Sequence, residues 1–337
     1  MAKLFILGSG GFGTSLAVMA RGCGHEVSLW SAFPEELEAI RRDGENKRLL
    51  PGVPVPEGIL LTKDLAGAAQ AELCIMAVPS FAVRQTAKRL FGILPEGVPV
   101  VNVAKGLEDG TFKRLTQVLE EELPGNPAVA LSGPSHAEEV ARGCPTTVVA
   151  ASRSRLAAEH AQDILMNPTL RIYVSDDVAG VELGGALKNV IALCAGVADG
   201  LQLGDNAKAA LMTRGITEIA RLGVFLGAKN ETFAGLSGIG DLIVTCTSMH
   251  SRNRRAGILI GQGASAEEAI GRIGMTVEGY LCARTAYEMS RRAGVEMPIV
   301  TEAYHVLYEG KDPRQAIRDL MDRPRRHESE AIWLLTR

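Results

Sequence analysis

The chain has 337 residues, with 36 lysines and arginines against 39 aspartates and glutamates, and a formal net charge of −3. This balance, with only 4% aromatic residues, excludes most nucleic-acid-binding proteins, which present basic surfaces and stacking side chains. The 46% hydrophobic content is typical of a globular protein, and the length suggests two domains.

The chain shows no signal for a membrane, a leader or a metal. We find no apolar stretch near the roughly 18 residues that a membrane span needs, and the N-terminal apolar run is too short for a signal peptide. The six cysteines and six histidines are scattered, without a pair at metal-ligand spacing. We therefore expect a cytoplasmic protein with neither a metal site nor a disulfide framework.

In chain order, the first half alternates short apolar runs with helical stretches. Several of these runs are apolar throughout, as parallel strands covered on both faces are. The predicted strands are 4–7, 27–29, 73–77, 98–103, 128–131, 147–151 and 171–174. From residue 178 onward the spacing is helical. The pattern predicts an α/β protein, with a Rossmann-like doubly wound domain over residues 1–178 and a mostly α-helical domain over 179–337.

A glycine-rich turn follows the first predicted strand and opens the first helix. Gly8, Gly10 and Gly13 occupy the glycine positions of G-x-G-x-x-G. Such glycines permit the tight turn, the approach of a pyrophosphate to the backbone, and close helix–strand packing. The free N–H groups at the start of the helix favour phosphate. The segment predicts a dinucleotide cofactor.

The end of the second predicted strand leaves the choice between NAD and NADP open. Residues 30–33 read Trp-Ser-Ala-Phe, without a carboxylate for a ribose 2′-OH or an arginine for a 2′-phosphate. Downstream, Arg41, Arg42 and Lys47 either form a solvated helix face or fold back over the adenosine. If they stay on the surface, we expect NADH and NADPH to work within about tenfold of each other.

Lys188 occupies an unusual place in the predicted helical half. Its neighbours one helical turn away are two glycines, an isoleucine and an alanine, and Asn189 is flanked in the same way. Burial of a lysine lowers its pKa toward the range that suits proton transfer. The alternative is a lysine whose chain extends to solvent at the helix end.

Two further segments of this half carry polar side chains suited to an anionic substrate. Asp241 follows a glycine-rich stretch and is either a site carboxylate or a helix N-cap. Ser251, Arg252 and Asn253 bring a guanidinium and hydrogen-bond donors together, which suits a phosphate group. The alternative for this basic run is a solvated face.

In the first half, Lys105 comes directly after a predicted strand, and Ser135 follows the next one. In open α/β sheets, ligands bind beyond the carboxyl ends of the strands, so both residues are expected to face the crevice. A plain surface position is the alternative for Lys105. His136 is expected to be structural or exposed.

Together these segments resemble bacterial-type NAD(P)-dependent glycerol-3-phosphate dehydrogenases over essentially the whole chain. The segments that carry the resemblance are the glycine loop, Val78-Pro79-Ser80, Lys105-Gly106-Leu107-Glu108, Ser132-Gly133-Pro134-Ser135, Gly184 to Val190, Asp199-Gly200, Gly204-Asp205-Asn206, Thr213-Arg214-Gly215, Gly238 to Leu242, and Ser251 to Arg255. The resemblance implies the reversible reaction of sn-glycerol 3-phosphate with NAD(P)⁺, run mainly as the reduction of dihydroxyacetone phosphate for phospholipid synthesis.

The resemblance also implies residue roles, with Lys188 as the proton donor and acceptor. Lys188, Lys105 and Asp241 form the expected catalytic set. The substrate-binding residues that it implies are Lys105, Gly133, Ser135, Lys188, Asn189, Asp241, Ser251, Arg252 and Asn253. The cofactor-binding residues are Gly8, Gly10, Gly11, Phe12, Gly13, Lys105, Ala137, Arg252, Thr276 and Glu278. The family often has His or Arg where this chain has Ala32, a departure that leaves the cofactor preference open.

Two other functions compete with this interpretation. One is another β-hydroxyacid-type dehydrogenase, acting on a phosphogluconate or a ketopantoate, which shares the domain order and a lysine. The other is a non-catalytic dinucleotide sensor, which has no need for a lysine on an apolar helix face. The sequence leaves the oligomeric state open, with a homodimer as one assembly.

Overall fold

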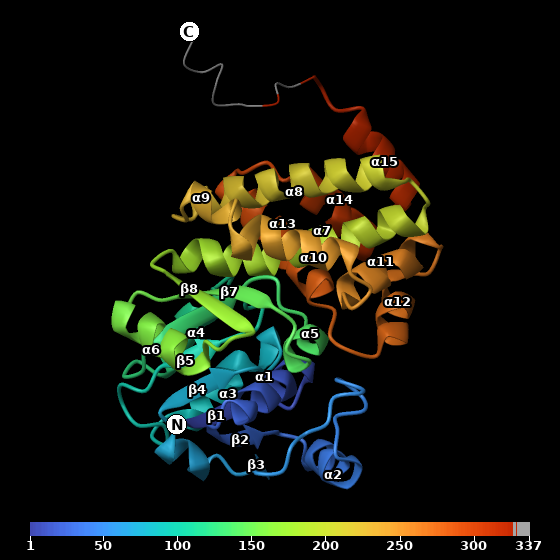
Figure 1. The fold of residues 1–337 in the computed structure, drawn as a ribbon. Helices are drawn as coiled ribbons and strands as arrows, with labels where there is room; N and C mark the ends of the chain where they lie inside the picture. The colour runs from blue at the N-terminus through green and yellow to red at the C-terminus, as the bar shows by residue number, and fades with distance from the viewer. Residues whose placement is uncertain (326–327, 329–337) are drawn as a thin grey trace.

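The computed structural model describes residues 1–325 and residue 328, and its lower part in Figure 1 is a sheet flanked by helices. The described residues form one eight-stranded sheet in the order β3-β2-β1-β4-β5-β6-β7-β8. Its strands are β1 (Lys3–Leu7), β2 (Glu26–Trp30), β3 (Ile59–Thr62), β4 (Leu73–Met76), β5 (Val100–Asn102), β6 (Ala128–Ser132), β7 (Thr146–Ala151) and β8 (Leu170–Ser175). In this order the chain proceeds from β1 to β3 toward one edge of the sheet and from β4 to β8 toward the other. The reversal between β1 and β4 confirms the doubly wound prediction.

Two features of the sheet differ from the sequence pattern. The strand β3 was not predicted, because it has four residues at the edge of the sheet and its Leu60 points outward. The strand β7 runs antiparallel to β6, whereas the strands from β1 to β6 pair in parallel. The short helix after β6, α5 (Ala137–Ala141), packs against α1 (Gly11–Gly22) instead of covering a crossover, so the chain returns in the opposite direction.

Helices cover both faces of the sheet, because its strands carry apolar side chains on both faces. In β1, Leu4 and Ile6 belong to one apolar cluster, and Phe5 and Leu7 belong to the other. Strands buried on both faces have this composition. The other helices of this half are α2 (Pro34–Asp43), α3 (Val83–Leu90), α4 (Leu115–Glu122) and α6 (Arg155–Leu165).

After the last strand the described chain is helical. The helices are α7 (Val178–Gly200), α8 (Asp205–Phe225), α9 (Asn230–Phe233), α10 (Asp241–Thr247), α11 (Arg252–Gly261), α12 (Ala266–Ile273), α13 (Glu278–Ala293), α14 (Pro298–Tyr308) and α15 (Pro313–Met321). The long helix α7 lies at the centre, with α8, α10, α11 and α13 packed around it (Figure 1). A Cβ on Gly257 of α11 would lie 2.0 Å from the carbonyl oxygen of Leu193, so glycine permits the backbones of α7 and α11 to touch.

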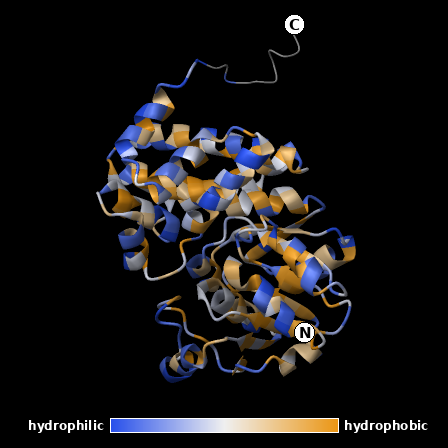
Figure 2. Cartoon of the chain, turned by 180° about the vertical axis from the view of Figure 1, so that it is seen from behind, coloured by the Kyte–Doolittle hydropathy of each residue, from blue (hydrophilic) through white to orange (hydrophobic). Residues whose placement is uncertain are grey.

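The composition of α7 corrects one expectation from the sequence. By length and composition α7 is apolar enough to cross a membrane, although no such stretch was expected. Within the protein, 89% of its most apolar window is buried, as in the central helix of a globular core. Figure 2 shows the same distribution, with apolar residues gathered inside each half and polar residues toward the outside.

Candidate active site

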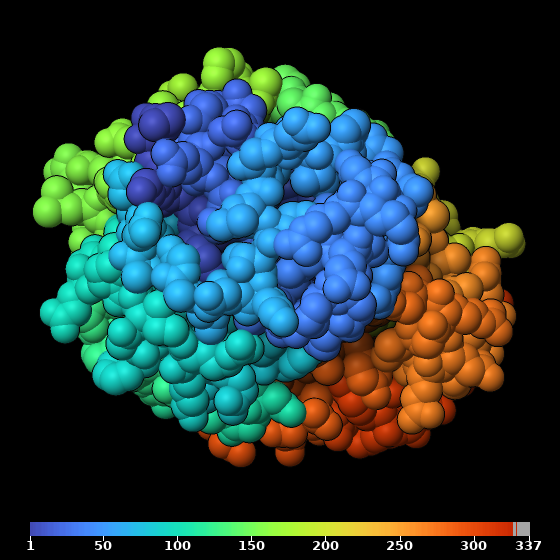
Figure 3. Space-filling model, turned by 90° about the horizontal axis from the view of Figure 1, so that it is seen from below, coloured from blue at the N-terminus to red at the C-terminus, as the bar shows by residue number. Residues whose placement is uncertain are grey.

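A cavity of about 450 Å³ lies between the carboxyl edge of the sheet and the helical half. Seen from below in Figure 3, the segment that includes α2, in blue, lies beside the helical half, in orange. Most of the predicted site residues line this cavity: Gly10, Gly11, Phe12, Lys105, Ser135, Ala137, Lys188, Asn189, Asp241, Ser251, Arg252, Asn253, Thr276 and Glu278. Gly8, Gly13 and Gly133 do not line the cavity themselves, but they belong to segments that do.

The glycine loop forms the sheet side of the cavity, and each glycine has a distinct steric reason. Gly8 has φ 115°, and a Cβ there would lie 2.6 Å from the carbonyl oxygen of Ala77. A Cβ on Gly13 would lie 2.0 Å from the carbonyl oxygen of Gly8. A Cβ on Gly10, by contrast, would meet no atom within 4 Å. Gly8 and Gly13 therefore close the turn, whereas Gly10 leaves free space in front of the α1 N-terminus, where a pyrophosphate fits.

The helical side of the cavity centres on one carboxylate that joins two lysines. Lys188 Nζ donates to Asp241 Oδ1 at 2.7 Å, and Lys105 Nζ donates to Asp241 Oδ2 at 2.7 Å. Lys105 also donates to the carbonyl oxygen of Gly133 at 2.8 Å and lies 3.4 Å from Ser135 Oγ. Lys188 and Asp241 are buried, with 4% and 1% of their surfaces exposed. The predicted catalytic residues therefore meet at one point.

Burial and charge set the protonation of this cluster. The pKa of Lys188 is lowered to about 8, mainly by burial and also by the charge of Lys105, while Asp241 opposes the change. Burial alone would raise the pKa of Asp241, but the two ammonium groups outweigh it and keep this pKa below its ordinary value. Burial and the nearby Lys188 also lower the pKa of His136, which lines the cavity as a neutral imidazole at neutral pH. With this pKa, the Lys188 amine can gain or lose a proton close to physiological pH.

A chain of amides holds this cluster in place. Asn253 Nδ2 donates to Asn189 Oδ1 at 2.9 Å, and Asn253 Oδ1 accepts from the backbone N–H of Gly279 at 2.8 Å. Asn189 Nδ2 in turn donates to the carbonyl oxygen of Lys105 at 3.2 Å. These bonds connect α13, α11 and α7 to the loop after β5. Part of the hydrogen-bonding capacity of both predicted substrate-binding asparagines is therefore used inside the protein.

The start of α11 presents cations to the cavity. Ser251 Oγ accepts from the backbone N–H of Arg254 at 3.2 Å and caps the helix. Arg252 lines the cavity, where burial lowers its pKa and Glu278 opposes the change. The Nε atom of Arg255 is buried, and no hydrogen-bond partner lies among the described residues. A guanidinium so placed can receive a phosphate oxygen.

Glu278 is also fixed from the sheet side. Its carboxylate accepts from Ser80 Oγ at 2.7 Å and from the Ser80 backbone N–H at 3.1 Å. Burial raises the pKa of Glu278. This contact ties the first turn of α13 to the segment after β4 across the cavity.

Comparison with known proteins fits this geometry. Residues 3–158 match the family model for the N-terminus of NAD-dependent glycerol-3-phosphate dehydrogenase, and residues 177–318 match the model for its C-terminus. The glycerol-3-phosphate dehydrogenase [NAD(P)+] of Moorella thermoacetica is 57% identical over 98% of each chain. That of Desulfitobacterium hafniense is 53% identical over 99% of this chain and 95% of its own. The chain belongs to this family.

Solved structures support the family assignment and separate it from one rival. The glycerol-3-phosphate dehydrogenase of Coxiella burnetii has a TM-score of 0.92 at 37% identity, over 96% of this chain and 99% of its own. A ketopantoate reductase from Ralstonia eutropha reaches a TM-score of 0.61 at 16% identity, over 94% of this chain and 99% of its own. The ketopantoate reductase therefore shares the fold only. The glycerol-3-phosphate dehydrogenase family uses NAD(P), in agreement with the predicted cofactor.

The structure excludes two alternatives that the sequence left open for single residues. Asp241 is the first residue of α10, and the cap before it is Gly240, so Asp241 is not the N-cap. Lys188 does not extend to solvent, because its Nζ is bound to Asp241 and to Thr245 Oγ1. The sequence reasoning missed Thr245. Its signal was the spacing of four residues from Asp241, which places both side chains on one face of α10.

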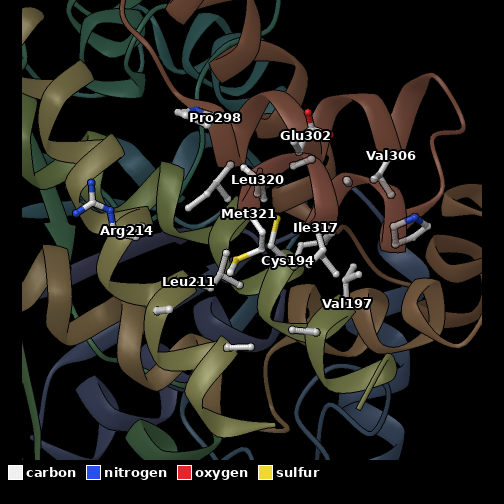
Figure 4. Close-up of a pocket in the computed structure, with 18 of the residues that line it drawn as sticks. Cys194, Val197, Leu211, Arg214, Pro298, Glu302, Val306, Ile317, Leu320 and Met321 are labelled. Atoms are coloured by element: carbon white, nitrogen blue, oxygen red, sulfur yellow. The ribbon is translucent and has the colours of Figure 1, made fainter. Parts of the chain in front are cut away.

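A second cavity, of about 350 Å³, lies between α7, α8, α14 and α15, and contains none of the predicted site residues. Figure 4 shows apolar side chains around it, among them Leu211, Val306 and Leu320, with Arg214 at its rim. Among the residues that the structure describes, no group of three or more histidine, cysteine, aspartate or glutamate side chains is placed so that it could hold a metal ion.

Proposed function

We propose that this protein catalyses the reversible, NAD(P)-dependent reduction of dihydroxyacetone phosphate to sn-glycerol 3-phosphate. The observation that carries the proposal is the buried Lys188 Nζ, held by Asp241 at 2.7 Å beside a second lysine, in a cavity that also contains a dinucleotide loop. The family relationship supports the same reaction.

The residues around the glycine loop fit a nicotinamide dinucleotide. The free space at Gly10 and the N-terminus of α1 accept the pyrophosphate, and Phe12, Ala137 and Glu278 line the adjoining wall. When bound, the cofactor supplies or accepts the hydride. Gly11 must stay small, because a Cβ there would lie 2.6 Å from the carbonyl oxygen of Leu49.

Lys188 handles the proton of the reaction. Its ammonium donates a proton to the C2 oxygen when the ketone is reduced, and the neutral amine takes the proton back in the reverse direction. Lys105 Nζ, anchored to Asp241 and Gly133, stabilises the negative charge that develops on the same oxygen. Asp241 orients both lysines and balances part of their charge.

Arg252, with Ser251 and Asn253, binds the phosphate of the substrate. The described lining carries Arg48, Lys105, Lys188, Arg252 and Arg255 against Glu138, Asp241 and Glu278, so the cavity favours an anion. Binding energy from the phosphate, which does not react, positions the carbonyl at the reacting centre. This is why we expect the phosphate to be essential.

We also infer how this reaction is organised in the cell. Residues 1–178 carry the glycine loop and Lys105, and residues 179–337 carry Lys188 and Asp241, so the reaction takes place between the two parts; we place it in the cytoplasm, where the product enters phospholipid synthesis. A homodimer is our proposed assembly. Sedimentation at two protein concentrations measures that state directly.

The decisive experiment follows the absorbance of NADH and of NADPH, in separate assays, with dihydroxyacetone phosphate as substrate. We expect rapid oxidation of the cofactor, and very slow oxidation with dihydroxyacetone, which lacks the phosphate. Turnover of ketopantoate or of an oxidised phosphogluconate, but not of dihydroxyacetone phosphate, would favour the other dehydrogenase class. Cofactor binding without turnover of any of these compounds would favour a sensor.

A further inference from the structure

A carboxylate that the sequence pattern did not reveal lies beside the glycine loop. Glu36, in the first turn of α2, accepts hydrogen bonds at a single oxygen, Oε2, from Ser9 Oγ at 2.6 Å and from Ser31 Oγ at 2.9 Å. Both serines are buried, with 2% of their surfaces exposed. Ser9 belongs to the glycine loop, and Ser31 directly follows β2.

These two serines place the carboxylate where dinucleotide folds bind the adenosine ribose, between the glycine loop and the end of the second strand. A carboxylate in that place accepts a hydrogen bond from the ribose 2′-OH and repels a 2′-phosphate. The second oxygen of Glu36, Oε1, takes part in no hydrogen bond within the described part of the chain. Glu36 thus has one oxygen for orientation and one for a ligand.

The cations that could counter this carboxylate are bound elsewhere. Arg41 donates to the carbonyl oxygen of Leu61, and Arg42 and Lys47 both pair with Asp43. Arg48 is the cation of this segment that lines the cavity. These contacts favour the solvated helix face for the first three residues over a position across the adenosine.

We propose that Glu36 makes the enzyme prefer NADH over NADPH, by accepting a hydrogen bond from the ribose 2′-OH and repelling the 2′-phosphate. The inference rests on the proposed function and names which cofactor that site takes. It replaces the expectation of nearly equal use, which considered only residues 30–33. The ratio of kcat/KM for NADH to that for NADPH should exceed about tenfold, which corresponds to about 1.4 kcal/mol.

The test compares Glu36→Gln with Glu35→Gln. Glutamine keeps an oxygen for Ser9 and Ser31, so Glu36→Gln removes the charge and retains the local contacts. Glu35 is exposed in the same turn of α2, so Glu35→Gln controls for the loss of one negative charge at nearly the same place. We expect Glu36→Gln to lower the NADH/NADPH ratio about tenfold, mainly through a lower KM for NADPH, and Glu35→Gln to leave the ratio unchanged.

Binding measurements separate this inference from the proposed reaction. Titration of each protein with NADH and with NADPH, followed by nicotinamide fluorescence, needs no substrate. If Glu36→Gln shifts the two affinities but no variant reduces dihydroxyacetone phosphate, the proposed function fails and the role of Glu36 stands. If the reaction proceeds but Glu36→Gln changes neither the NADH/NADPH ratio of kcat/KM nor the ratio of the two binding affinities, the proposed role of Glu36 is wrong. A preference for NADPH that disappears in Arg48→Ala would also overturn it.

Discussion

The two walls of the active-site cavity recognise ligands in opposite ways. The sheet wall offers the main-chain N–H groups at the start of α1 and the free space beside Gly10, which has no side chain. The helical wall works through buried charges, centred on Lys188 and Asp241. A glycine wall suits the part of a cofactor that many enzymes share, whereas placed charges define one reaction.

The walls also differ in what they require of the surrounding structure. Glycines at a turn need only compatible backbone conformations, which neighbouring residues decide. A buried lysine loses its hydration, and its charge persists only where a partner compensates. Asp241 is that partner for both Lys188 and Lys105, at 2.7 Å from each. The helical wall therefore depends on distant segments that meet correctly.

The largest effect should come from removing the proton donor of the helical wall. Lys188→Ala should lower kcat by roughly 10²–10⁴-fold, the usual contribution of a positioned acid or base. Cofactor binding, which depends on the sheet wall, should change little. Steady-state kinetics and a titration with NADH measure the two properties separately. If turnover stayed near that of the wild type, Lys188 would not be the proton donor.

A smaller effect should follow from changing the shape of the phosphate contact. Arg252→Lys keeps the charge but loses the planar fork, and a hydrogen bond to a charged group contributes about 1.5–3 kcal/mol. We expect kcat/KM for dihydroxyacetone phosphate to fall roughly 10- to 100-fold. Arg314→Lys, on the exposed face of α15, is the matched control and should be neutral. Equal kinetics for both variants would remove the phosphate role of Arg252.

Two glycine variants separate space from packing in the sheet wall. Gly10→Ala should fold, because its Cβ meets no atom within 4 Å, but should weaken cofactor binding by about 1–3 kcal/mol as an overpacked site. Gly13→Ala should instead lower the free energy of unfolding, since its Cβ would lie 2.0 Å from the carbonyl oxygen of Gly8. Thermal unfolding and NADH titration distinguish the two. The opposite pattern would contradict the steric interpretation of the loop.

The smallest effect near neutral pH is expected in the pH dependence of kcat, which depends on the protonation state of Lys188 in the helical wall. Reduction needs protonated Lys188, whose pKa is about 8, so kcat for reduction should fall above that pH. Oxidation of glycerol 3-phosphate needs the neutral amine and should rise toward the same pH.

Asp241→Asn sharpens this test. Asp241 raises the pKa of Lys188, so its neutralisation should move both pH profiles to lower pH. The pH profile of kcat in both directions measures the shift, and Glu231→Gln, an exposed carboxylate in α9, serves as the control. A profile that stays in place would mean that Lys188 does not titrate in the rate-limiting step.

The sequence by itself determined the features that depend on near neighbours. The glycine loop, the doubly wound first half and the helical second half follow from local spacing and apolar periodicity, because backbone conformation and burial are repeated along the chain. Lys188 was visible for the same reason, since its neighbours on the helix are all apolar or glycine.

Only the tertiary structure decided which side chains meet. Asp241 is 53 residues from Lys188 and 136 from Lys105, and Ser9 is 27 from Glu36. Periodicity indicates that a residue is buried but not what it contacts. The sequence therefore could not predict that Asp241 pairs with both lysines, or that the Glu36 carboxylate lies beside the glycine loop. The edge strand β3 was missed for a related reason, because a segment of only four residues, one of them the exposed Leu60, becomes a strand only by pairing with β2. Charges far apart in sequence acquire their pKa values and roles only when folding removes water from between them.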